Sequence, residues 1–139
     1  MKARPVTEAR LHRQIADYLR WALDDTSLFF HIPMGGSRHF LEAKNLKKLG
    51  SRAGIPDIAI LHGGCAFFTE LKTEGGELST SQKYMIPLIE QAGCPVAVCR
   101  SLEDVIAFLH HHGVPLRFEP ISAERIRRGF TNAMKDAAE

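Results

Sequence analysis

Long apolar runs and cysteine are the features that this sequence most clearly lacks. Its longest apolar runs are short, such as residues 58–61. A transmembrane helix needs about 20 apolar residues in a row, so we expect no membrane span. The first ten residues, MKARPVTEAR, are polar, and we expect no secretory signal peptide. The three cysteines cannot all pair with one another and have no metal-type spacing. Reduced thiols in a cytoplasmic protein are therefore the expected state.

The composition that remains is that of an ordinary globular chain. Of the 139 residues, 45% are hydrophobic and 24% are charged, values typical of a folded domain that buries its own core. No repeat, low-complexity tract or long linker divides the chain. We predict a single domain over residues 1–139, with a core at about residues 8–113 and a C-terminal helical extension over residues 121–139.

The net charge of +2 hides an uneven distribution of charge along the chain. Residues 1–52 contain ten Lys and Arg against five Asp and Glu, whereas residues 53–120 contain four against eight. A basic flank beside an acidic middle would suit a phosphate-binding surface next to a metal-binding carboxylate site. The alternative is chance unevenness on a solvated surface.

Hydrophobic periodicity and capping signals predict alternating helices and strands. The expected elements are a helix at 8–23 with Thr7 as its N-cap, a buried strand at 28–33, a basic helix at 41–49, a strand pair within 54–72, a helix at 80–92, a strand at 95–100, a helix at 102–112 and a polar surface helix from residue 122. Pro87 should kink or shorten the helix that contains it. This order predicts an α/β fold in which helices flank a central mixed sheet.

The strand pair predicts where two acidic side chains meet. Residues 63–64 are Gly-Gly, a favoured two-residue hairpin turn because both positions can take positive φ. If the residues on either side of this turn pair with each other, Asp57 comes to lie opposite Glu70 on the same face of the sheet, with Cβ atoms roughly 5 Å apart. Facing like charges destabilise a sheet, and a hard divalent cation bound by oxygen ligands would remove that repulsion.

Lys72 extends this candidate site. It lies two residues beyond Glu70 and therefore points to the same face of the strand. Its ammonium group could hold an attacking water or neutralise charge that grows on a phosphate. Pro56, just before Asp57, suits the start of a strand. The alternative is an exposed Glu70–Lys72 ion pair on a polar sheet face.

Glu8 and Gln82 each lie on the apolar stripe of a predicted helix, close to its start. Both polar groups should therefore face the sheet. The alternative for Glu8 is a favourable charge at a helix N-terminus. The alternative for Gln82 is a capping box with Ser79.

The sequence resembles the VRR-NUC family of the PD-(D/E)XK nuclease superfamily. The resemblance covers roughly residues 8–109 and is carried, in order, by Glu8, HIPMGGSR, LKKLGSRAGIPDIAI, FFTELKTEGGELSTSQ and PVAVCRSLEDVIAFL. It implies a restriction-endonuclease-like fold and a magnesium- or manganese-dependent phosphodiesterase of DNA metabolism. The positions that match the family's site are Glu8, Asp57, Glu70, Lys72 and Gln82. Met34 departs from the pattern, since relatives often have Asn before the two glycines.

On this interpretation Asp57, Glu70 and the backbone carbonyl of Leu71 bind one Mg²⁺ or Mn²⁺. Glu8 completes this site or bridges to a second ion. Lys72 orients or deprotonates the nucleophile, and Gln82 positions Lys72 or the phosphate.

Other basic and histidine-rich segments carry weaker signals. We predict phosphate contacts from a basic segment, with an ordinary solvated helix as the alternative; its residues are Arg38, Lys44, Lys47, Lys48 and Arg52. Residues 110–112 are three consecutive histidines that point in different directions, so we expect surface side chains or favourable C-terminal charges rather than a zinc site. Arg125, Arg127 and Arg128 could touch nucleic acid or a partner chain.

The function expected from the sequence is that of a metal-dependent endonuclease acting on DNA, including branched, four-way junction DNA. Short stand-alone members of the family, often phage-borne, are associated with homodimers, so a bacterial or phage-encoded homodimer is expected. The candidate contact surfaces are HFLEAKNL or a C-terminal set with Ile121, Ile126 and Phe130. The alternatives are a non-catalytic nucleic-acid-binding module of the same fold and a nuclease that acts on RNA.

Overall fold

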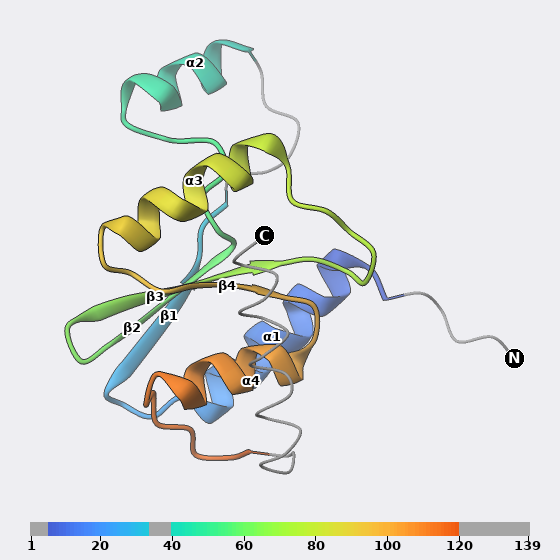
Figure 1. Cartoon of the computed structure of the whole chain (residues 1–139), viewed down its shortest axis with the longest axis vertical. Helices are drawn as coiled ribbons and strands as arrows, with labels where there is room; N and C mark the ends of the chain where they lie inside the picture. Colours follow the sequence, from blue (N-terminus) through green and yellow to red (C-terminus); the bar gives the residue numbers. More distant parts are fainter. Residues whose placement is uncertain (1–5, 34–39, 120–139) are drawn as a thin grey trace, which may run out of the picture.

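The computed structural model describes residues 6–33 and 40–119 and contains one four-stranded sheet with helices on both faces (Figure 1). The sheet order is β1-β2-β3-β4; β1 pairs antiparallel with β2, β2 antiparallel with β3, and β3 parallel with β4. The elements are α1 (Glu8–Ala22), β1 (Ser27–His31), α2 (Phe40–Lys48), β2 (Ile58–His62), β3 (Cys65–Leu71), α3 (Thr80–Gln91), β4 (Val96–Cys99) and α4 (Leu102–His111). The predicted mixed α/β sheet is confirmed.

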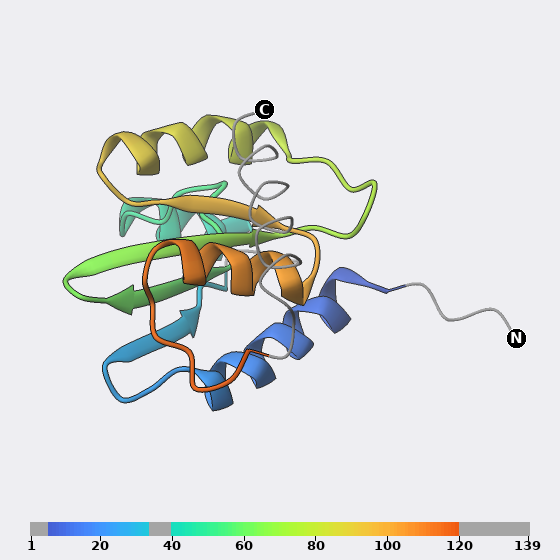
Figure 2. The same cartoon turned by 60° about the horizontal axis from the view of Figure 1, so that its bottom comes forward.

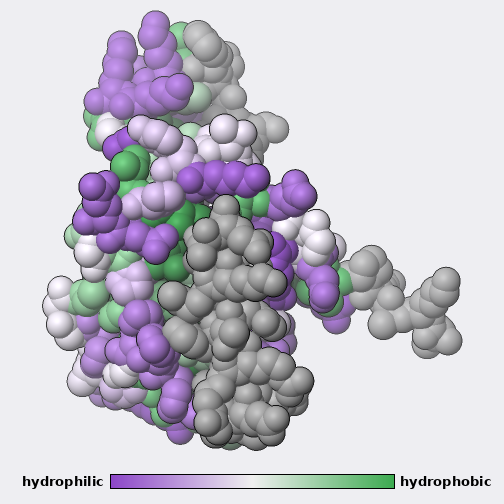
Figure 3. Space-filling model, viewed as in Figure 1, coloured by the Kyte–Doolittle hydropathy of each residue, from purple (hydrophilic) through white to green (hydrophobic). Residues whose placement is uncertain are grey.

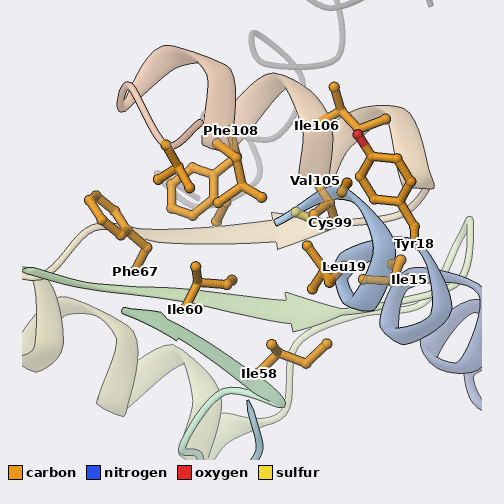
Figure 4. Close-up of a cluster of buried hydrophobic side chains, with 14 of the residues drawn as sticks. Ile15, Tyr18, Leu19, Ile58, Ile60, Phe67, Cys99, Val105, Ile106 and Phe108 are labelled. Carbon is orange, nitrogen blue, oxygen red and sulfur yellow. The ribbon is translucent and has the colours of Figure 1, made fainter. Parts of the chain in front are cut away.

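The main core lies between the sheet and the two helices α1 and α4, which cover the same face (Figure 2). Thr7 caps α1 as predicted, since its side chain accepts a hydrogen bond from the backbone N–H of Arg10. The apolar stripe of α1 packs with side chains of the sheet and α4 (Figure 4), among them Ile15, Leu19, Ile58, Ile60, Phe67, Val105 and Phe108. The helix α3 covers the opposite face, and α2 lies beyond it at the top of Figure 1.

The β2–β3 hairpin has the predicted register. Ile58 pairs with Thr69 and His62 with Cys65, and the two glycines of the turn take φ angles of 58° and 78°. Asp57 immediately precedes β2 and Glu70 lies near the end of β3, so the register brings the two acidic residues to the same end of the sheet.

Three expectations need correction. The strand β1 is not buried: among the described strands it pairs with β2 alone, at the edge of the sheet, and Leu28 is 60% exposed. Of the two effects predicted for Pro87, a kink or a shortening, the shortening does not occur, since α3 continues to Gln91. His112 is not a plain surface residue, because its ring lies 5.3 Å from the ring of Phe67 and 4.9 Å from that of Phe108, centroid to centroid. Burial, and then His111, lower the pKa of His112.

Several predicted features lie outside the described residues. They are Met34, Arg38, the C-terminal helix from residue 122, and the side chains of Ile121, Arg125, Ile126, Arg127, Arg128 and Phe130. None of the described helices is long and apolar enough to cross a membrane. None of the three cysteines, all of them described, forms a disulfide.

Candidate active site

Four chain segments meet at one end of the sheet and bring polar side chains together there. Glu8 begins α1, Asp57 precedes β2, Glu70 lies near the end of β3, and Gln82 lies in the first turn of α3. All four line a cavity of about 450 Å³. The structure therefore places four of the five predicted side chains around one cavity.

The three carboxylates are close enough to share a cation. Glu8, Asp57 and Glu70 each offer one carboxylate oxygen, and these oxygens lie within 4.8 Å of one another. Glu70 is 2% exposed, and its Oε2 is buried without a hydrogen-bond partner in residues 6–33 and 40–119. Burial, and then the nearby charge of Asp57, raise the pKa of Glu70 to about 8. The described residues place Lys72 and Gln82 at Glu70 Oε1 but offer Glu70 Oε2 no partner. A hard divalent cation would supply that partner and further positive charge for the three carboxylates.

Asp57 is held in place through its side chain and its backbone. Its Oδ2 accepts a hydrogen bond of 2.8 Å from the backbone N–H of Leu71, and its carbonyl accepts one of 2.8 Å from the N–H of Ile32. The hairpin and the edge strand thus fix this carboxylate at the end of the sheet. The carbonyl of Leu71 as a metal ligand stays a prediction.

Gln82 forms the predicted capping box, and its side chain also contacts Glu70. Its side-chain Oε1 accepts from the backbone N–H of Ser79, and Ser79 Oγ accepts from the backbone N–H of Gln82, which forms the capping box. Its Nε2 donates to Glu70 Oε1 over 2.8 Å. The helix cap therefore orients the amide that holds one oxygen of Glu70.

Lys72 does not line the cavity but lies next to Glu70. Its Nζ lies 3.9 Å from Glu70 Oε1, and its side chain is largely buried. Its backbone N–H donates to the carbonyl of Cys99, which extends the β3–β4 pairing by one residue. The alternative of an exposed Glu70–Lys72 pair is wrong, because both side chains are shielded from solvent.

Two residues near the cluster were not singled out from the sequence. His31 lines the cavity, its Nδ1 lies 2.8 Å from the carbonyl oxygen of Asp57, and its ring packs edge-on against that of His12 at 4.5 Å. Gly54 has a φ of +85°, and a Cβ there would come within 2.2 Å of the carbonyl oxygen of Ser81. The β1–β2 pairing and the approach of α3 create these contacts, so residue spacing alone gave no signal for them.

Four of the five predicted basic residues are described, and none of them lines the carboxylate cavity. Lys44, Lys47 and Lys48 are exposed on α2, where Figure 3 shows hydrophilic side chains gathered at the top of the molecule. Lys47 and Arg52 line a second groove, between α2 and α3.

Comparison with known proteins identifies the family. The sequence model of the VRR-NUC domain matches residues 7–103. The chain belongs to the VRR-NUC family. A solved structure described as a VRR_NUC domain protein is similar, with a TM-score of 0.59 and 20% sequence identity, covering 77% of this chain and 91% of that chain. It supports the restriction-endonuclease-like fold, and the family is one of nuclease-type domains. No curated protein matches this VRR-NUC chain.

The buried Glu70 should make the stability of this VRR-NUC domain depend on pH when no metal is bound. Its pKa of about 8 in the folded protein lies above its ordinary value of 4.5. Below pH 4.5 Glu70 is neutral in both the folded and the unfolded protein. As the pH rises from 4.5 to 8, the unfolded chain ionises before the folded one, so the free energy of unfolding falls. At pH 7 the loss would be up to roughly 3 kcal/mol.

Chemical denaturation of metal-free protein between pH 5 and pH 8 measures this loss. We expect Glu70→Gln to flatten the decline, because the amide cannot ionise, and a divalent cation to flatten it in the native sequence. An equal decline in Glu70→Gln would assign the effect to another group.

Proposed function

We propose that this protein is a metal-dependent endonuclease that hydrolyses DNA phosphodiester bonds. The observation that carries the proposal is the cluster of three carboxylate oxygens within 4.8 Å of one another, with a buried Glu70 oxygen that no donor among the described residues contacts. Mg²⁺ or Mn²⁺ would be held by Asp57, Glu70 and the carbonyl of Leu71, with Glu8 completing the site.

The chain's own residues would prepare the reaction around that ion. A bound divalent cation would lower the pKa of a water molecule and neutralise negative charge on the phosphate. Gln82 fixes one oxygen of Glu70, and the N–H of Leu71 fixes one oxygen of Asp57. Lys72 would orient the attacking water or donate to a phosphate oxygen, so its charge would matter most in the transition state.

A non-catalytic binding module is the main alternative from another functional class. A module that only recruits nucleic acid has no need of a buried carboxylate with a raised pKa beside a second carboxylate, because that arrangement costs stability. Glu70 is such a group. We therefore favour catalysis.

Incubation with linear, flapped, four-way and single-stranded DNA, and with RNA of the same sequences, tests the proposal. Cleavage should require Mg²⁺ or Mn²⁺, stop with a chelator and resume when the metal is restored. Binding without cleavage of any substrate in either metal would support the recruitment module instead. Cleavage of RNA alone would overturn the assignment to DNA.

The basic segment should govern affinity rather than chemistry. Replacing Lys44, Lys47 and Lys48 by glutamine should weaken binding to duplexes of all sequences alike, because phosphates carry no sequence information. The slope of log K against log salt should become shallower by about 0.9 for each phosphate that a lysine no longer neutralises. Fluorescence anisotropy at several salt concentrations measures the slope, and an unchanged slope would place the DNA elsewhere.

We further propose a cytoplasmic homodimer acting on branched DNA. One site cuts one strand per engagement, whereas a two-fold dimer would present two sites to strands of opposite polarity. Sedimentation should then give about twice the chain mass of 15.5 kDa. A monomer that merely nicks would contradict the dimer without touching the proposed chemistry.

A further inference from the structure

A second groove lies beside the carboxylate cavity, between α2 and α3. Its volume is about 490 Å³, within the range of pockets that hold small organic groups. Ala53 and Ser81 line both the groove and the carboxylate cavity, so the two are contiguous. A chain bound at the carboxylates could therefore continue into this groove.

The wall shared by the two depressions is fixed by a close approach of backbones. Gly54 follows Ala53, and a Cβ at position 54 would collide with the backbone of Ser81 and Gln82. Since glycine has no Cβ, the segment that carries Arg52 can lie directly against the start of α3. The same contact involves the backbone of Gln82, whose side chain donates to Glu70.

The groove combines an aromatic ring, an apolar surface and two cations. Tyr84 lines it from α3 with 64% of its surface exposed, next to the buried Met85. Lys47 and Arg52 also line it, and neither forms an ion pair with any carboxylate in residues 6–33 and 40–119. Phosphate binding alone needs cations but no aromatic ring. Stacking of a nucleobase needs such a ring.

We propose that this groove binds an unpaired stretch of the substrate strand, with one base stacked on Tyr84 and its phosphates against Lys47 and Arg52. A base inside a duplex has both faces covered by its neighbours, so only an unpaired or displaced base can lie on the tyrosine ring. The inference deepens the proposed function and rests on it. It assigns to the enzyme a strand that is single-stranded on the α2–α3 side of the scissile bond.

Binding of a short oligothymidylate of about 12 nucleotides tests the inference without any cleavage. The full chain is titrated by fluorescence anisotropy in the presence of a chelator, and a strand of the same length with abasic sites serves as the second ligand. Tyr84→Ala removes the ring and Tyr84→Phe keeps it. Trp21→Ala is the matched control, because Trp21 is also 60% exposed and aromatic but does not line the groove.

Tyr84→Ala should weaken binding to oligothymidylate about tenfold, the size of one base–aromatic stacking interaction, and leave its salt dependence unchanged. The same substitution should leave binding to the abasic strand and to a blunt duplex unchanged, and Tyr84→Phe and Trp21→Ala should match the native sequence. Equal affinities of Tyr84→Ala and the native sequence for oligothymidylate would overturn the inference. So would a Tyr84→Ala effect that is the same on the abasic strand.

The outcome separates this inference from the proposed function. A stacking effect in a protein that cuts nothing would support the groove and refute the nuclease. Metal-dependent cleavage with no effect of Tyr84→Ala on oligothymidylate would support the nuclease and refute the groove.

Discussion

Asp57→Asn is expected to leave the protein folded and to lower the cleavage rate by roughly a thousandfold or more, which corresponds to several kcal/mol of lost transition-state stabilisation. Asparagine keeps a side-chain oxygen that can accept the hydrogen bond from the N–H of Leu71, so the end of the hairpin should hold its shape. What it removes is the negative charge that a divalent cation requires. Glu70→Gln should act in the same way, since its amide oxygen can still accept from Gln82.

Both variants are measured for cleavage in Mg²⁺ and in Mn²⁺, and for thermal unfolding without metal. They should be as stable as the native sequence or more so. Asp57→Asn removes a charge beside two other carboxylates, and Glu70→Gln replaces a buried group that is costly to ionise. Glu90→Gln is the matched control: it neutralises a glutamate of α3 outside the cavity and should keep full activity. Full cleavage by Asp57→Asn would remove Asp57 from the site.

Lys72→Ala is expected to lower kcat by roughly 10² to 10⁴, the usual range for a group that assists proton transfer in the transition state. KM and metal affinity should change little, because the ammonium acts on charge that develops during the reaction. The largely buried position of Lys72, 3.9 Å from Glu70 Oε1, gives it access to the reaction centre that an exposed lysine lacks. Lys83→Ala, on the exposed side of α3, is the matched control and should leave kcat unchanged.

Calorimetric titration with metal distinguishes a catalytic Lys72 from a structural one. If Lys72→Ala binds Mn²⁺ and DNA as the native sequence does, the loss of turnover belongs to the reaction step. If metal binding falls together with turnover, Lys72 acts only by holding Glu70 in place, and its assigned role is wrong.

The register of the hairpin was predictable because it depends on local chemistry. A Gly-Gly turn admits one favoured two-residue geometry, and from it follow the pairs from His62–Cys65 to Ile58–Thr69. The meeting of Asp57 and Glu70 is a consequence of that register. The start of α3 was equally local, since the Ser79 capping box specifies it within a few residues.

Features that depend on how distant segments pack were not predictable in the same way. The exposure of Leu28 follows from the place of β1 at the sheet edge, which the apolar character of the strand does not reveal. His31 joins the site through its pairing opposite Ile58, the residue after Asp57. Tyr84 lines a groove because the segment before Gly54 packs against α3. Such contacts come from tertiary packing rather than from periodicity.

If the three carboxylates bind a divalent cation, titration calorimetry with Mn²⁺ near pH 7 should detect that binding. The native sequence should bind Mn²⁺ and release protons, because Glu70, with a pKa of about 8, must lose its proton to coordinate. Repeating the titration in buffers of different ionisation enthalpy reveals that release. Asp57→Asn should bind at least about tenfold more weakly, and Glu70→Gln should bind without the proton release. Absence of Mn²⁺ binding in the native sequence, or unchanged binding in both variants, would show that these carboxylates do not form a metal site.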